Sequence, residues 1–219
     1  MLSFVAGLVN VTGVLALKIL TTNITGHLAY FSEEIALQNY LEALILLSYI
    51  LAFFMGAFFS NLIIEIFVRK NVMISYVLPL SAEIVLLLII SLLGTAFFDV
   101  RVIAFILLFA MGLQNALVTK VSNSVVRTTH LTGLFTDLGI EISQLIFYRK
   151  NKQNVNQLMQ SINLKLAIIF CFFTGCVLAG ILFKKMQMHT LLLAVVVLII
   201  AMFYDYMRLY YFHLKRKFR

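Results

Sequence analysis

Long apolar stretches separated by short polar segments run along almost the whole chain. A helix needs about 20 apolar residues to cross the roughly 30 Å of hydrocarbon in a bilayer. Six stretches approach or exceed this length, at residues 3–20, 41–68, 72–97, 101–119, 162–183 and 189–212. Each is predicted to be an α-helix, because an open strand leaves its backbone polar groups unsatisfied in lipid. The pattern therefore predicts an all-α, polytopic transmembrane bundle of six spans.

The segment between the fourth and fifth spans, residues 128–148, has a different pattern. Its apolar residues recur at helical spacing, and polar residues lie between them. The apolar set is Leu134, Leu138, Ile142, Leu145 and Ile146, and the polar set on the other side is Asp137, Glu141 and Gln144. This spacing predicts an amphipathic or re-entrant helix and not a full span.

The composition is typical of an integral membrane protein. The chain is 63% hydrophobic and 12% charged, with a mean hydropathy of +1.03, whereas soluble domains are about half apolar. One proline and ten glycines leave no long linker, so we expect a single membrane domain over residues 1–219. Cys171 and Cys176 lie inside one apolar stretch and are expected to pack, not to form a disulfide or bind a metal. No cofactor is expected.

The distribution of basic residues predicts the orientation of the chain. Six spans place both termini on one side, and the basic tail 214–219 indicates that this side is the cytoplasm. Thirteen basic residues then face the cytoplasm and four face outward. The cytoplasmic set is Arg69, Lys70, Lys120, Arg127, Arg149, Lys150, Lys152, Lys165, Arg208, Lys215, Arg216, Lys217 and Arg219; the outward set is Lys18, Arg101, Lys184 and Lys185. Because the net charge of +8 collects at span ends, nucleic-acid binding is not expected.

Three short sequences occur twice, in the same order. GLVN (7–10), TTNITG (21–26) and FFMG (53–56) are matched by GLQN (112–115), TTHLTG (128–133) and FFTG (172–175). The basic loop RKNKQNVNQ (149–157) accounts for the extra length of the second copy. We expect one repeat over about 1–97 and a second over about 101–213. Three spans per repeat force the copies into opposite orientations, which is the inverted-repeat architecture of secondary transporters.

The motifs also resemble a known family. GLVN, TTNITGHL, LAFFMGAFFS, SAEIVLLLI, AMGLQNALVTK and TTHLTGLFTDLGIE are similar to the YoaK-like family of bacterial membrane proteins, whose function is uncharacterised. The resemblance implies a six-span protein of the bacterial inner membrane and brings no established substrate. Members commonly carry an acid near the position of Asn10, and Asn at the position of His27, so a role that needs an acid in the first span does not transfer to this chain.

The two TTxxTG segments are the first candidates for a substrate site. Their hydroxyls compete for backbone acceptors and their glycines permit a break in a helix, which frees backbone groups for a ligand. The amides inside the spans are added to them. The candidate substrate-binding residues are Asn10, Thr21, Thr22, Thr25, Gly26, Gln114, Asn115, Thr128, Thr129, Thr132 and Gly133. The alternatives are that the threonines cap helices and that the amides bond neighbouring helices.

Four carboxylates are candidates for coupling to a proton or a sodium ion. Glu83 lies in the middle of an apolar span, where a charged group is costly unless it meets protein or a cavity. Asp137 and Glu141 lie one helical turn apart, and Glu34 is the equivalent of Glu141 in the first repeat. Structural roles are the alternatives, as a solvated helix face for Asp137 and Glu141 and as a hydrogen-bonded carboxyl for Glu83.

These features favour a secondary transporter or channel for a small solute or ion. The expected partner is the lipid bilayer, and both a monomer and a homo-oligomer are compatible with the sequence. A non-transporting scaffold is the second reading. Catalysis is the third, and it lacks support because no HExxH, GxSxG, nucleotide loop or CxxC occurs. Small residues at every fourth position are expected at helix contacts. They are Ala52, Gly56 and Ser60 in one span, and Cys171, Gly175 and Ala179 in another.

Overall fold

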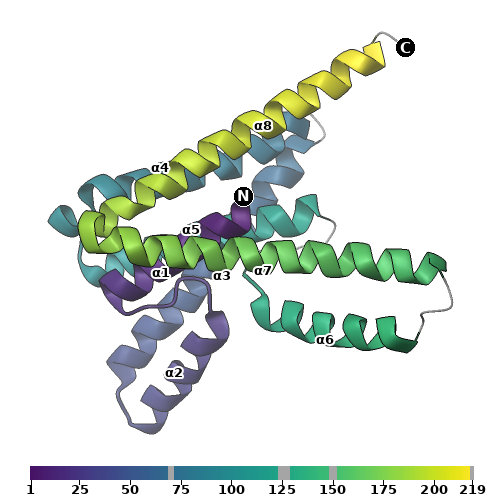
Figure 1. The fold of residues 1–219 in the computed structure, drawn as a ribbon. Helices are drawn as coiled ribbons and strands as arrows, with labels where there is room; N and C mark the ends of the chain where they lie inside the picture. The colour runs from purple at the N-terminus through teal and green to yellow at the C-terminus, as the bar shows by residue number, and fades with distance from the viewer. Residues whose placement is uncertain (69–71, 123–128, 148–151, 218–219) are drawn as a thin grey trace.

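The computed structural model describes residues 1–68, 72–122, 129–147 and 152–217, and all of its regular structure there is helical. The long helices that follow one another in the chain run in opposite directions (Figure 1). In chain order the helices are α1 (Leu2–Leu17), α2 (Ile24–Ala36), α3 (Tyr40–Val68), α4 (Val72–Phe97), α5 (Val100–Val121), α6 (Leu131–Phe147), α7 (Lys152–Met186), the 3₁₀ helix η1 (Gln187–Thr190) and α8 (Leu191–Lys217).

Four helical runs within the described residues are long and apolar enough to cross a membrane. They cover residues 40–68, 75–94, 100–121 and 155–204. The last run is 50 residues long because it takes in most of α7, all of η1 and the first half of α8. α1 is equally apolar but has only 16 residues. The prediction of an all-α membrane protein is therefore confirmed.

The long helices fall into two sets by direction. In Figure 1, α1, α4 and α7 run toward the left-hand end of the molecule, and α3, α5 and α8 run toward the right. Two ion pairs agree with this for α3 and α5. Glu42 meets Arg101 where both helices begin, and Glu65 meets Lys120 where both helices end. α3 and α5 are therefore parallel to each other.

Two helix crossings are made at glycines. A Cβ atom built on Gly56 would overlap the carbonyl oxygen of Phe109, and one built on Gly112 would overlap that of Phe53, so α3 and α5 touch backbone to backbone. α1 and α7 cross in the same way. There Gly7 lies against the carbonyl of Phe172, and Gly175 lies against that of Phe4. The predicted small-residue contacts are confirmed at Gly56 and Gly175.

Two predicted boundaries are wrong. The first helix ends at Leu17 and not near residue 20, because Lys18 adopts the left-handed conformation (φ 61°) and bonds back to Gly13 and Val14. α7 begins at Lys152, so most of the predicted loop RKNKQNVNQ is helix. Its Lys and Gln side chains are compatible with a helix, and this part of α7 runs beside α6 (Figure 1).

α2 and α6 each form a hairpin with the helix that follows. α2 packs on α3, and α6 packs on α7. The predicted faces of α6 are partly wrong. Leu134 and Leu138 are buried as expected, but Ile142 and Ile146 are exposed and the Glu141 side chain is only 16% exposed. Lys165 of α7 turns Glu141 inward by pairing with it.

Candidate functional site

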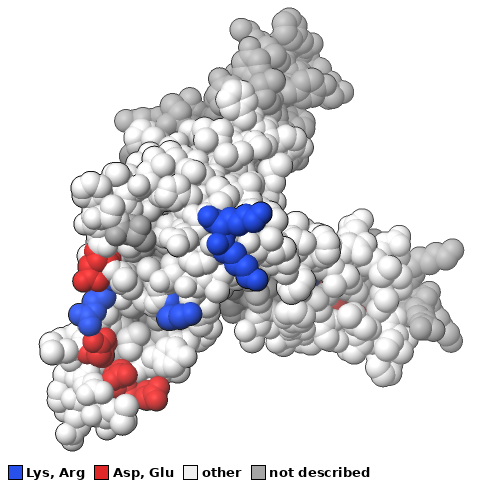
Figure 2. All heavy atoms as spheres, turned by 60° about the vertical axis from the view of Figure 1, so that its left-hand side comes forward, with Lys and Arg blue, Asp and Glu red and all other residues white. Residues whose placement is uncertain are grey.

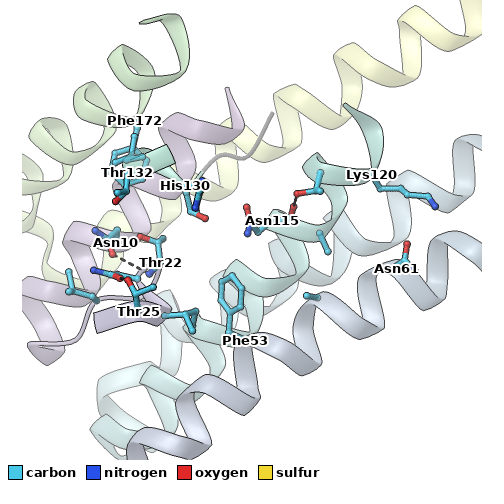
Figure 3. Close-up of a pocket in the computed structure, with 18 residues that line it drawn as sticks. Asn10, Thr22, Thr25, Phe53, Asn61, Asn115, Lys120, His130, Thr132 and Phe172 are labelled. Atoms are coloured by element: carbon cyan, nitrogen blue, oxygen red, sulfur yellow. Dashed lines mark hydrogen bonds between the residues drawn. The ribbon is translucent and has the colours of Figure 1, made fainter. Parts of the chain in front are cut away.

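A cavity of about 1150 Å³ lies where α1, α3, α5 and α7 meet the beginnings of α2 and α6 (Figure 3). It extends from the middle of α3 and α5 toward their C-terminal ends, where Asn61 and Lys120 are exposed. The lining residues are Asn10, Leu20, Thr22, Asn23, Ile24, Thr25, Phe53, Ala57, Asn61, Asn115, Ala116, Thr119, Lys120, Thr129, His130, Leu131, Thr132 and Phe172.

The first TTxxTG segment reaches this cavity because the chain doubles back after α1. The left-handed Lys18 reverses its direction, and Thr21 packs onto Gly13, where a larger residue would not fit. The backbone N–H of Thr22 then donates to the side-chain oxygen of Asn10 at 3.3 Å. Asn10 lies halfway along α1, so α2 starts inside the bundle and not at its end.

The first residues of α2 and α6 are organised in similar ways. In α2, the side-chain oxygen of Asn23 accepts from the N–H of Gly26 at 3.0 Å and from the hydroxyl of Thr25 at 2.7 Å, which is an ordinary N-cap. In α6, the ring of His130 lies over Gly133, where a Cβ atom would overlap it. Both TTxxTG segments therefore begin a helix at the cavity wall.

The cavity is lined by the same positions of both repeats. Six pairs of equivalent residues contribute to its wall. They are Asn10 with Asn115, Thr22 with Thr129, Asn23 with His130, Ile24 with Leu131, Thr25 with Thr132, and Phe53 with Phe172. The GLxN and FFxG motifs thus place their glycines at the helix crossings and their Asn or first Phe at the cavity. The TTxxTG motifs contribute polar residues to the cavity wall.

The wall carries little charge. Lys120 is its one Lys or Arg side chain within the described residues, and none of the lining residues is Asp or Glu. Lys120 donates to Glu65 at 2.6 Å, and both side chains are about half exposed. The remaining polar wall consists of asparagines, threonines and the His130 ring. This surface suits a polar solute that forms neutral hydrogen bonds.

Ten of the eleven predicted substrate residues belong to the described part of the chain, and they divide into three groups. Asn10, Thr22, Thr25, Asn115, Thr129 and Thr132 line the cavity. Gly26 and Gly133 lie just behind the wall, under the residues that begin α2 and α6. Thr21 and Gln114 are fully buried outside it. Thr128 lies outside the described residues.

The sequence analysis missed several lining residues. Asn23 and His130 belong to the repeated TTxxTG segments, and Phe53 and Phe172 belong to the repeated FFxG motifs, so the repeat itself was a signal for them. Asn61, Thr119 and Lys120 belong to none of the repeated motifs. Nothing in the sequence around them distinguishes a cavity wall from an exposed helix face.

None of the four candidate carboxylates lines the cavity. Glu34 accepts from the side-chain amide of Asn39 at 2.9 Å, and Asp137 is exposed. Glu141 accepts from Ser161 and pairs with Lys165. Glu83 is fully buried in α4, and neither of its oxygens has a hydrogen-bond partner within the described residues.

Breaking the Glu141–Lys165 pair should destabilise the protein. The two side chains are only 16% and 13% exposed, so Glu141→Gln leaves a poorly solvated ammonium group and should cost roughly 1–3 kcal/mol. Glu42 and Arg101 form the matched control, because both are more than half exposed and Glu42→Gln should cost less than about 1 kcal/mol. Melting temperatures in detergent measure both. Equal losses in the two variants would contradict the buried role.

His27 of α2 packs against α3, outside the cavity lining. Its ring is buried, its Nε2 donates to the carbonyl of Leu20 at 2.7 Å, and it packs edge-on against Tyr49. Its Nδ1 is buried with no partner within the described residues. Burial lowers the pKa of His27, and the bond to Leu20 offsets only part of this effect. The folded protein therefore favours the neutral form of the His27 ring.

The stability of the protein should consequently fall in acid. The unfolded chain binds a proton at His27 near pH 6.5, before the folded chain does, so stability decreases as the pH falls through about 6.5 and levels off below the folded pKa. His27→Leu should remove this part of the pH dependence. Leucine is a fitting replacement because Leu134 is buried at the equivalent position of the second repeat. Melting curves from about pH 8 to about pH 5 provide the measurement.

The comparisons with known proteins match the chain to a family. The family described as "Protein of unknown function (DUF1275)" matches residues 1–204. No curated protein and no solved structure matches the chain.

Proposed function

Since the chain belongs to the DUF1275 family, we propose its function from the site itself: a secondary transporter or channel for a small polar solute. The YoaK-like proteins belong to the same family, whose function is unknown. One observation carries this proposal. A cavity of about 1150 Å³ is lined by six matched pairs of residues from two sequence repeats. Secondary transporters bind their substrates at the interface between such repeats.

We infer an inverted repeat of three spans per half, with α1, α3 and α4 in the first and α5, α7 and α8 in the second. The directions of the helices support it. α1 and α5 run in opposite directions, as do α3 with α7 and α4 with α8 (Figure 1). The glycine crossings support it as well, because each of them joins one helix of the first half to one helix of the second.

We propose six spans by dividing the longest apolar run and including α1. A straight helix of 50 residues would be about 75 Å long, more than twice the hydrocarbon thickness. In Figure 1 the chain reverses at η1, and α8 runs back in the direction opposite to α7. We therefore count the 50-residue run as two spans. α1 is about 24 Å long, which is close to the roughly 30 Å of hydrocarbon, and we count it as the remaining span.

We propose that the end at which α3 and α5 finish faces the cytoplasm of a bacterial inner membrane. Acidic side chains gather at the opposite end, over α2 and the adjoining part of α3 (Figure 2). Glu33, Glu34, Glu42 and Asp99 there balance the four outward basic residues, Lys184 and Lys185 included. Under this proposal the thirteen basic residues predicted to be cytoplasmic stand against four acids, Glu65, Asp137, Glu141 and Asp205.

Among the four carboxylates, Glu83 is the one we propose for coupling to a proton. Glu34 and Glu141 are held by partners, and Asp137 is exposed. Glu83→Gln keeps the shape of the side chain but cannot titrate, so it should leave the protein folded while removing the pH dependence of transport. Glu34→Gln is the matched control and should leave that dependence unchanged. Transport by the Glu83 variant with the wild-type pH profile would refute the role.

The proposed function is tested by ligand-induced thermal stabilisation of the purified protein across a panel of polar metabolites, followed by uptake into proteoliposomes. A ligand at 100 times its Kd should stabilise the folded protein by about 2.7 kcal/mol. Gly133→Leu should abolish this stabilisation, because the leucine displaces His130 from the cavity wall. Gly139→Leu is the control, since a Cβ atom there meets nothing. A stabilising ligand that is not transported would favour the scaffold reading.

A further inference from the structure

Asn10 and Asn115 hold equivalent positions in the two repeats, yet they differ in what they bind. The side-chain oxygen of Asn10 accepts the backbone N–H of Thr22 at 3.3 Å. The side-chain oxygen of Asn115 is buried and has no partner within the described residues. Thr129, the equivalent of Thr22, lines the same cavity but does not supply the matching bond. In the first repeat the asparagine therefore binds its TTxxTG segment, which we call the closed arrangement. In the second repeat this bond is absent, which we call the open arrangement.

We propose that Asn10 and Asn115 form a hydrogen-bond switch that closes one repeat at a time. In this structure Asn10 holds the first TTxxTG segment, and the cavity extends toward the C-terminal ends of α3 and α5. In the opposite state Asn115 accepts the N–H of Thr129, Asn10 is released, and the cavity extends toward the other end. This proposal rests on the inverted repeat and transport function proposed above.

The one-sided cavity supports the switch. On α3 and α5 its wall consists of Phe53, Ala57, Asn61, Asn115, Ala116, Thr119 and Lys120, all in the middle or the C-terminal part of these helices. The opposite side is filled where the first segment doubles back, since Leu17, Thr21, His27 and Tyr49 are buried there. An inverted repeat can exchange the conformations of its halves, and this exchange turns the opening to the other side.

The open asparagine also indicates the chemistry of the solute. A buried amide oxygen without a donor is costly, and a solute that carries an N–H or O–H group relieves that cost. The surrounding wall offers threonine hydroxyls and asparagine amides but no described carboxylate. The switch therefore favours a small polar solute with a hydrogen-bond donor, such as an amine, amide or polyol, bound to whichever asparagine is free.

The test uses a cysteine at Asn61 as a reporter of the opening, in the full-length protein with Cys171 and Cys176 replaced by alanine. Its reaction rate with an impermeant maleimide is measured in inverted membrane vesicles. Asn10→Ala removes the bond that holds the present state and should slow labelling by up to about five-fold, the factor expected for one hydrogen bond. Asn115→Ala should not slow it. The double variant should return toward the parent rate.

Thr22→Pro and Thr129→Pro form a second matched pair, because proline removes the N–H donor without changing either asparagine. Thr22→Pro should slow labelling of the Asn61 cysteine, and Thr129→Pro should not. A cysteine at Gly139, outside the cavity, should label at one rate in every background. An unchanged rate in both Asn10→Ala and Thr22→Pro, or equal slowing by the equivalent changes in the second repeat, would overturn the switch. Because these readouts need no solute, a switch that fails is distinguishable from a transport function that fails.

Discussion

Adding one methyl group at Gly56 should cost the protein about 3 kcal/mol or more, because the new Cβ atom overlaps the carbonyl of Phe109 and must push α3 away from α5. The obstacle is backbone, so no side-chain rotation relieves it. Gly112→Ala, Gly7→Ala and Gly175→Ala meet the same obstacle and should behave alike. Their melting temperatures should fall by roughly 10 °C.

Gly180 and Gly139 supply the controls for this prediction. A Cβ atom at either position has nothing within 4 Å, and alanine is the better helix former by roughly 0.5–1 kcal/mol. Gly180→Ala and Gly139→Ala should therefore leave the melting temperature unchanged or raise it. A loss at these two sites as large as that of Gly56→Ala would mean that the crossings are not what makes the glycines necessary.

Cysteines at Ser32 and at Gly139 should label from opposite sides of the membrane. The two positions are equivalent in the repeats, Ser32 in α2 and Gly139 in α6, and both are exposed. In the background without Cys171 and Cys176, Ser32→Cys should react with an impermeant maleimide in intact cells. Gly139→Cys should react only after the membrane has been opened. The expected contrast is nearly all or none.

Labelling of both cysteines from one side would mean that the two halves are parallel. The six-span arrangement and the transporter proposal would then fail together. The glycine crossings and the cavity would stand, since neither depends on how the chain is oriented. This test is therefore specific to the inverted repeat, whereas the Gly56 series is specific to the packing.

The repeated motifs predicted much of the site without any structure. Asn10, Thr22, Thr25, Thr129 and Thr132 were chosen because the two TTxxTG segments and the GLxN motifs occur twice, and all five line the cavity. A duplicated polar phrase inside apolar sequence is informative, because polar groups are costly at membrane depth unless they meet a cavity or a partner.

The carboxylates could not be placed in this way. Glu141 was assigned to the solvent side of its helix, and it instead faces α7 because Lys165 lies there to pair with it. That lysine is 24 residues away in the sequence. Glu83 was recognised as buried, but the sequence did not indicate that it is absent from the cavity wall.

The sequence by itself determined that this is an all-helical membrane protein, where most of its helices begin and end, and which segments are duplicated. Length and hydropathy suffice for the first two, because a bilayer admits few kinds of structure. Only the tertiary structure decided which faces of the helices meet. These helices are apolar on nearly all sides, so hydrophobicity does not distinguish one face from another. The glycine crossings determine which faces meet, and so do polar pairs such as Glu141 with Lys165. Both kinds of contact join residues that are far apart in the sequence.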